Sequence, residues 1–182
     1  MGLPKQLLAY KESTLIGHTL KQLTNLSSVQ IFVVTGAFQE EVTKEIASFD
    51  IEIIHHAEWE MGMGSSLARG IREVKKNSTF GQVLITLCDL PLLDSTFYES
   101  LIEFHISQGN DITRTAYSDV KGVPAVFNRS YFLELEKLSS EEGAKNVVQS
   151  HKERVTDFTW PEPYFDIDTP EAYEKLQRLP SE

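Results

Sequence analysis

Short apolar segments alternate along this chain with segments whose apolar residues recur at helical spacing. The segments with strand character are residues 29–34, 51–54, 82–87, 111–116, 123–127 and 164–167. Those with helical character are residues 14–26, 39–49, 66–76, 95–108, 131–138, 143–151 and 170–179. A helix that crosses over between two strands leaves them parallel. The alternation therefore predicts an α/β fold with a mostly parallel sheet and helices on both faces.

The composition suits one domain spanning residues 1–182. Of the 182 residues, 41% are hydrophobic, which is enough for a full core. The formal net charge is -10, and both nucleic acid and anionic membranes attract clusters of cations. We therefore expect neither nucleic acid nor a membrane as a partner.

Cys88 is the only cysteine, so an intrachain disulfide is impossible and a reducing compartment is favoured. We expect its side chain to fill core space. No apolar stretch approaches the ~20 residues that span a bilayer, and the N-terminus lacks the pattern of a signal peptide. These features predict a cytoplasmic protein.

Asp89 is the sharpest candidate for a functional residue. Ligands of open α/β sheets bind beyond the carboxyl ends of the strands, and Asp89 follows the apolar segment 82–87 almost directly. Pro91 then ends the strand. A carboxylate in this position can hold Mg²⁺ while phosphates and waters complete the coordination. The alternative is that Asp89 only stabilises a turn, for which aspartate is favoured.

A second acidic pair, Asp166 and Asp168, lies in a short strand-like segment before Thr169 and Pro170. Alternation along a strand places both carboxylates on one side, so both could reach a metal that Asp89 also holds. The structural alternative is strong, because acidic residues near a helix start are favoured by capping and by the helix dipole.

Gly62 and Gly64 precede Ser65, where we expect a helix capped by that serine. The free N–H groups of a helix start can bind an anionic or polar ligand. The simpler interpretation is that the glycines only permit a turn. His55 and His56 are adjacent on a strand and point to opposite faces, so we do not expect them to share a metal.

Six segments, in this order and spacing, resemble the molybdenum cofactor cytidylyltransferases and the related MobA-like nucleotidyltransferases. Each segment is a weak signal alone, but the ordered set is far more specific. The matching segments are residues 1–8, 59–70, 88–91, 122–127, 142–145 and 166–171. The resemblance covers nearly the whole chain and implies a Rossmann-like, three-layer nucleotidyltransferase domain.

The resemblance also implies a reaction. In the family, CMP passes from CTP to the terminal phosphate of the molybdopterin-type molybdenum cofactor, and pyrophosphate is released. Lys5 would neutralise charge on the triphosphate. Asp89 would hold Mg²⁺, with Asp168 as the second ligand and Asp166 as a weaker candidate. Without the resemblance, Lys5 is a solvated lysine near a terminus.

The resemblance further places some residues on the substrate side of the cleft, namely Ser65, Ser66 and Gly122. A molybdoenzyme that receives the finished cofactor is the implied partner. The alternatives are a non-catalytic relative that binds the pterin cofactor and delivers it, and transfer to another phosphate acceptor or from GTP.

The family pattern begins with a strand and a glycine-rich loop that this chain does not contain before Lys5. We therefore expect a gap in the sheet where that first strand would lie, and an incomplete triphosphate site. A start codon assigned too late, a truncated chain and a natural variant without catalysis would each explain the difference.

Overall fold

The computed structural model describes residues 4–118, 120–139, 141 and 143–179. The expected matches at residues 1–3 and at Glu142 lie outside them. The helices are α1 (Leu15–Leu23), α2 (Gln39–Ile46), α3 (Met63–Lys76), α4 (Ser95–Ser107), α5 (Phe132–Leu135), α6 (Lys145–Ser150) and α7 (Pro170–Gln177). The strands are β1 (Ala9–Tyr10), β2 (Ser13–Thr14), β3 (Phe32–Thr35), β4 (Glu52–His55), β5 (Gln82–Ile85), β6 (Ile112–Ala116), β7 (Lys121–Asn128) and β8 (Val155–Thr159). Short 3₁₀ helices lie at η1 (Lys5–Leu7), η2 (Trp59–Met61), η3 (Arg129–Tyr131) and η4 (Lys152–Arg154).

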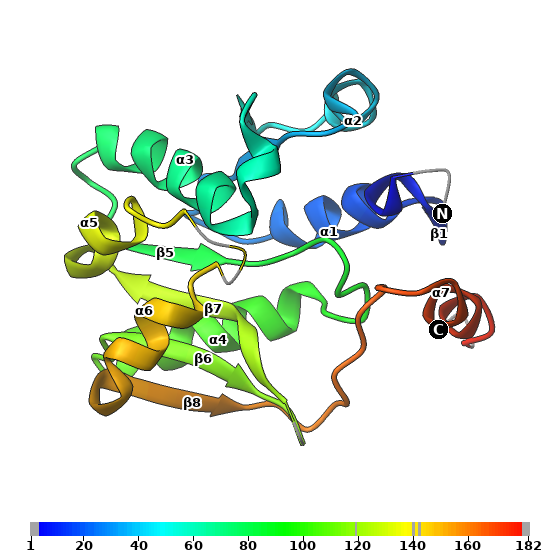
Figure 1. The fold of residues 1–182 in the computed structure, drawn as a ribbon. Helices are drawn as coiled ribbons and strands as arrows, with labels where there is room; N and C mark the ends of the chain where they lie inside the picture. Colours follow the sequence, from blue (N-terminus) through cyan, green and yellow to red (C-terminus); the bar gives the residue numbers. More distant parts are fainter. Residues whose placement is uncertain (1–3, 119, 140, 142, 180–182) are drawn as a thin grey trace.

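The largest sheet has the strand order β5-β7-β6-β8, and a separate pair joins β3 to β4 in parallel (Figure 1). The α/β class is confirmed. The sheet is mixed rather than mostly parallel, because β7 runs antiparallel to both β5 and β6. Only residues 117–120 join β6 to β7, which is too short for a crossover helix and forces a hairpin-like return.

The strand expected at residues 164–167 is not formed, and β8 lies at Val155–Thr159 instead. β8 pairs in parallel with β6. The amide of Trp160 still donates to the carbonyl of Ala116, and the chain then leaves the sheet. Two prolines, Pro161 and Pro163, follow at once and cannot donate to a ladder.

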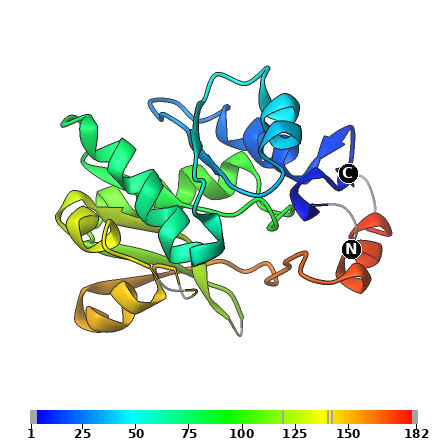
Figure 2. The same ribbon diagram turned by 45° about the horizontal axis from the view of Figure 1, so that its top comes forward.

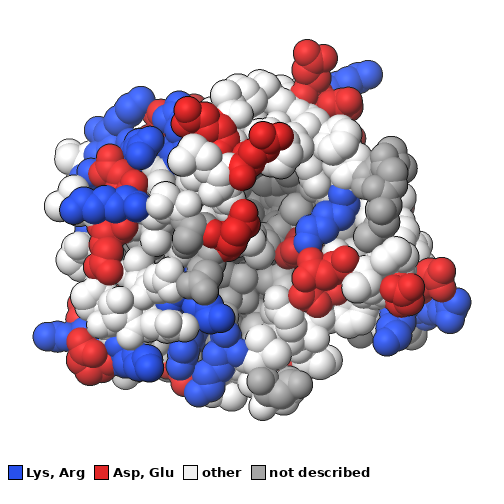
Figure 3. Space-filling view, in the orientation of Figure 1, with Lys and Arg blue, Asp and Glu red and all other residues white. Residues whose placement is uncertain are grey.

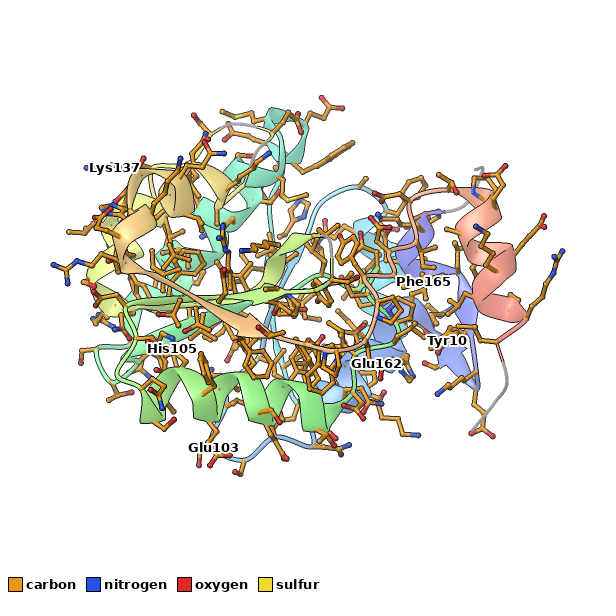
Figure 4. All side chains as sticks on the ribbon, turned by 90° about the horizontal axis from the view of Figure 1, so that it is seen from below. Tyr10, Glu103, His105, Lys137, Glu162 and Phe165 are labelled. Carbon is orange, nitrogen blue, oxygen red and sulfur yellow. The ribbon has the colours of Figure 1, made fainter. Side chains whose placement is uncertain are left out.

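Helices cover both faces of the large sheet, as the alternation predicts. α3, α5 and α6 pack on one face around Ile112 and Phe127, and α4 packs on the other through Phe97 and Leu101. Figure 4 shows α4 alone on its face, with Glu103 pointing away from the sheet and His105 between the helix and the strands. His105 is buried, and its ring nitrogens contact Thr113 and Asn128.

β3 and β5 do not pair with each other. Within the described part of the chain, β3 pairs only with β4 and β5 only with β7. Both strands line a cavity of about 1440 Å³, together with residues from α1 and α3. The two strands, which do not pair with each other, thus face a shared cavity.

The N-terminal segment and α7 lie side by side, although they are far apart in sequence (Figures 1 and 2). Tyr10, Leu15, Ile167 and Leu176 form one buried cluster between them. The hydroxyl of Tyr173 on α7 also donates to the carbonyl of Ala9. This packing fixes the acidic segment before α7 against the start of the chain. None of the helices in the described ranges is long and apolar enough to cross a bilayer.

Candidate active site

Lys5 lies between two carboxylates from distant parts of the sequence. Its Nζ is 2.6 Å from Oδ2 of Asp89 and 2.6 Å from Oδ1 of Asp168. Asp89 is buried, whereas Asp168 is exposed. The structure thus brings together the lysine and the two acids that the sequence assigned to one phosphate and metal site.

Three elements position this cluster. Lys5 begins η1 at the start of the described chain, and Asp89 follows β5 in the loop that Pro91 continues. Asp168 comes from the segment before α7. The amide of Ile167 donates to the carbonyl of Asp89 at 3.0 Å, which holds the two acidic segments together through their backbones.

The charges of the cluster perturb its titration. Burial alone would lower the pKa of the Lys5 ammonium, but hydrogen bonds to Asp168 and Asp89 and the charges of both acids raise that pKa well above its usual range. The hydrogen bond from Lys5 lowers the pKa of Asp168. Counted by formal charge, two carboxylates against one ammonium make the cluster net negative.

Asp166 lies beside this cluster, but its pKa is shifted in the opposite direction from that of Asp168. Burial, followed by the charge of Asp168 and a hydrogen bond to it, raises the pKa of Asp166. Burial and the charges of Asp166, Asp89 and Asp168 likewise raise the pKa of Tyr164 to about 12. The region around Lys5 therefore disfavours further negative charge.

The donor set fits one Mg²⁺ ion. Oδ1 of Asp89 is buried and accepts no hydrogen bond from the described residues, so it remains free to bind a cation. Mg²⁺ is commonly held by one or two carboxylates together with substrate phosphates and waters. Across the described residues, no three acidic, histidine or cysteine side chains gather into a ready metal cage. Asp89 and Asp168, which both contact Lys5, are the two carboxylates that could hold a cation here, and Asp166 does not complete a group of three with them.

Ser65 and Ser66 have different surroundings. α3 begins at Met63 with Gly62 as its N-cap, so the expected cap at Ser65 is wrong. The Ser65 hydroxyl is buried and donates to the carbonyl of Gly62 at 2.8 Å. Its oxygen then accepts from Nε2 of His56 at 3.0 Å. Ser65 is therefore engaged inside the fold, while Ser66 lines the cavity near the site.

No sequence pattern indicated the contact between His56 and Ser65, because two adjacent histidines on a strand are unremarkable. The same holds for the contact between Gly36 and Trp59. A Cβ atom added at Gly36 would lie 2.5 Å from Cβ of Trp59, so only glycine fits where β3 ends. This close approach shapes a second cavity of about 440 Å³, which Gln6, Ser66 and Cys88 also line.

Gly122 is the second residue of β7 and lines the larger cavity. An added Cβ there would meet no atom within 4 Å, so the space beside it is open. Figure 3 shows the hollow that these cavities form, with acidic and basic side chains at its rim. The structure thus brings Ser66 and Gly122 to one cavity. Lys5 and Asp89 line neither of these two cavities, but their chain neighbours Gln6 and Cys88 both line the smaller one.

An α/β sheet with charged groups beyond its strand ends is typical of domains that bind phosphate-bearing ligands. Residues 1–155 match the MobA-like NTP transferase domain. This match covers most of the chain, and the chain belongs to that family.

Known proteins agree with this assignment. The bifunctional protein GlmU of Bifidobacterium longum (strain NCC 2705) is 29% identical over 112 residues, which is 60% of this chain and 24% of GlmU. The chain therefore spans about a quarter of the length of that relative. Among solved structures, Rv0371c from Mycobacterium tuberculosis H37Rv has a TM-score of 0.86 and 25% identity, over 97% of this chain and 89% of Rv0371c.

Two further structures share the fold at lower identity. Rv0371c in complex with manganese has a TM-score of 0.84 and 23% identity, covering 97% of this chain and 92% of that one. A cytidylyltransferase from Leptospira borgpetersenii serovar Hardjo-bovis (strain JB197) has a TM-score of 0.73 and 17% identity, covering 95% and 78%.

Proposed function

We propose that this protein is a Mg²⁺-dependent nucleotidyltransferase that transfers CMP from CTP to the terminal phosphate of the molybdopterin-type molybdenum cofactor. One observation carries the proposal. Lys5 stands between Asp89 and Asp168, next to a carboxylate oxygen that accepts no hydrogen bond from the described residues. A lysine and two acids in contact are the groups needed to hold a triphosphate with its counter-ion.

This reaction requires little covalent chemistry from the protein itself. An oxygen of the acceptor phosphate attacks the α-phosphorus of CTP and forms the new P–O bond. The bond from the α-phosphorus to the bridging oxygen breaks, and pyrophosphate leaves with the electron pair. Negative charge grows on the departing pyrophosphate, so positioned cations supply most of the rate enhancement.

The residues of this chain would divide these tasks. Asp89 and Asp168 would hold a Mg²⁺ ion, which would supply charge neutralisation and orientation for the triphosphate. Lys5 keeps its proton throughout the ordinary pH range and would bind phosphate oxygens. Ser66 and Gly122 would contact substrate in the cavity that they line, whereas Ser65 would support the start of α3.

The test follows pyrophosphate release from the chain with Mg²⁺, the pterin cofactor and either CTP or GTP. We expect release with CTP, and a loss of at least a hundredfold in Lys5→Gln, since the amide removes the charge that faces the phosphates. Lys44→Gln is the matched control, because Lys44 is an exposed lysine on α2 that contacts no described acid.

Other outcomes would select the alternatives. Faster release with GTP would reassign the base, and release only with a sugar or alcohol phosphate would reassign the acceptor. Binding of the pterin cofactor without any pyrophosphate release would favour a carrier that delivers the cofactor to a molybdoenzyme.

A further inference from the structure

Three basic residues line the larger cavity away from Lys5. They are Arg114 in β6, Lys121 at the start of β7 and Lys145 at the start of α6. Alternation along β6 puts Arg114 on the same face as Ile112, which packs among α3, α5 and α6. Figure 3 shows basic side chains gathered at the lower edge of the hollow, over the region of α6 and β6.

Asp157 in β8 binds two of these cations with one carboxylate. Its Oδ1 is 2.6 Å from Nε of Arg114, and its Oδ2 is 2.7 Å from Nζ of Lys121. Lys145 forms no hydrogen bond or ion pair with any residue that the structure describes. Counted by formal charge, the group of Arg114, Lys121, Lys145 and Asp157 is net positive.

An irregularity in the sheet brings Arg114 and Lys121 to the same carboxylate. Arg114 pairs with Ala125, yet the next residue, Thr115, pairs with Gly122. Two residues of β7 are therefore bulged out of the ladder. Bulges bend a strand and redirect its side chains, and they are common beside functional sites. Here the bulge draws Lys121 along β7 towards Arg114 and leaves the open space next to Gly122.

The two charged clusters thus differ in sign. The cluster of Lys5, Asp89 and Asp168 is net negative and needs a metal ion before it can attract an anion. The group around Arg114 and Lys121 can bind an anion directly, because a guanidinium and an ammonium already lie within reach of one carboxylate.

We propose that Arg114 and Lys121, assisted by Lys145, form the binding site for the phosphate group of the acceptor molecule. This role rests on the proposed nucleotidyl transfer, in which the nucleotide binds at Lys5. Asp157 holds the two cations in position, and the phosphate binds their remaining donor hydrogens.

The first experiment measures binding of inorganic phosphate without metal. ¹⁵N NMR titration in the presence of EDTA should shift the amide signals of Arg114 and Gly122, and leave those around Asp89 in place. Arg114→Gln and Lys121→Gln should each weaken phosphate binding about tenfold, because each removes a charged donor. Lys137→Gln is the control, since Lys137 is exposed at the end of α5 (Figure 4).

The Asp157→Asn variant distinguishes two interpretations of these residues. They form either a phosphate-binding site or an ion-pair network that only stabilises the sheet. Removing the competing negative charge should tighten phosphate binding about threefold or more. A purely structural network predicts no such gain. Phosphate shifts that are the same in all four variants, or that centre on Lys5, would overturn the proposal.

The second experiment measures steady-state kinetics with the acceptor. Arg114→Gln should raise KM for the acceptor about tenfold and leave KM for CTP within twofold. Pyrophosphate release with an unchanged acceptor KM would refute this site and leave the proposed function standing. Phosphate binding at Arg114 and Lys121 without any pyrophosphate release would keep the site and refute the transferase function.

Discussion

Asp89→Asn tests the metal site most directly. The substitution keeps the shape of the side chain and removes its charge, so the buried Oδ1 that no described residue satisfies loses its affinity for a cation. Among the described residues, Asp168 then remains the only carboxylate in contact with Lys5. The local charge changes from net negative to neutral.

The magnitude follows from the geometry. Metal neutralisation at a phosphoryl centre is worth several kcal/mol, and each 1.36 kcal/mol is tenfold in rate. A loss of about 4 kcal/mol corresponds to a turnover lowered roughly a thousandfold. The fold should survive, because an asparagine oxygen can still accept from Lys5, and one hydrogen bond between partly exposed groups is worth about 1 kcal/mol.

Two measurements check this prediction. Pyrophosphate release with CTP reports turnover, and Mn²⁺ titration followed by electron paramagnetic resonance reports metal affinity, which should fall at least tenfold. Asp50→Asn is the matched control, because Asp50 is exposed and lies outside the cavities. Near-normal turnover and unchanged Mn²⁺ affinity in a folded Asp89→Asn protein would refute the assignment.

Three further substitutions or treatments give defined outcomes. Burial and a neighbouring carboxylate raise the pKa of Asp166, so its ionised form destabilises the fold. Asp166→Asn should therefore raise Tm at pH 7, and the gain should disappear below pH ~3.5, where the group is protonated in both states. Burial raises the pKa of Cys88 to about 11, so thiol-specific alkylation should be slow at pH 8 and accelerate towards pH 11. Gly36→Ala should cost about 2 kcal/mol and lower Tm by roughly 4–8 °C, because its Cβ would overlap Trp59, whereas Gly81→Ala should be neutral, since its Cβ would meet no atom within 4 Å.

The fold class was readable from the sequence because apolar periodicity reports local structure. The direction of the strands and the position of β8 could not be predicted from it. β8 mixes polar and apolar residues after a charged stretch, and its strand character comes from pairing with β6 rather than from its own composition. β7 runs antiparallel to β6 because the connection after Ala116 is short. The segment between the two strands has no helical pattern, and we did not infer the strand direction from that absence.

Residues of the candidate site could be predicted where a suitable side chain stands at a suitable place in the chain. Asp89 follows an apolar strand segment and Asp168 precedes a helix, so each could be named from its place in the chain. Their meeting at Lys5 depends on the backbone bond from Ile167 to Asp89, which sequence patterns do not reveal. Likewise, nothing in the sequence distinguishes Ser65, whose hydroxyl is used inside the fold, from Ser66, which lines the cavity.

The position of Lys5 has a consequence for the order of binding. In the free protein its ammonium pairs with both Asp89 and Asp168, so a nucleotide has to break these contacts before it can bind Lys5. On the proposed function, the two acids would hold a metal ion in exchange for the ammonium, and Lys5 would bind the phosphates. The exchange conserves the number of charge pairs, so its cost is small. A bare nucleotide cannot make this exchange, because it adds negative charge to a cluster that is already net negative. On the proposed function, the metal ion must therefore reach the site before the nucleotide or together with it.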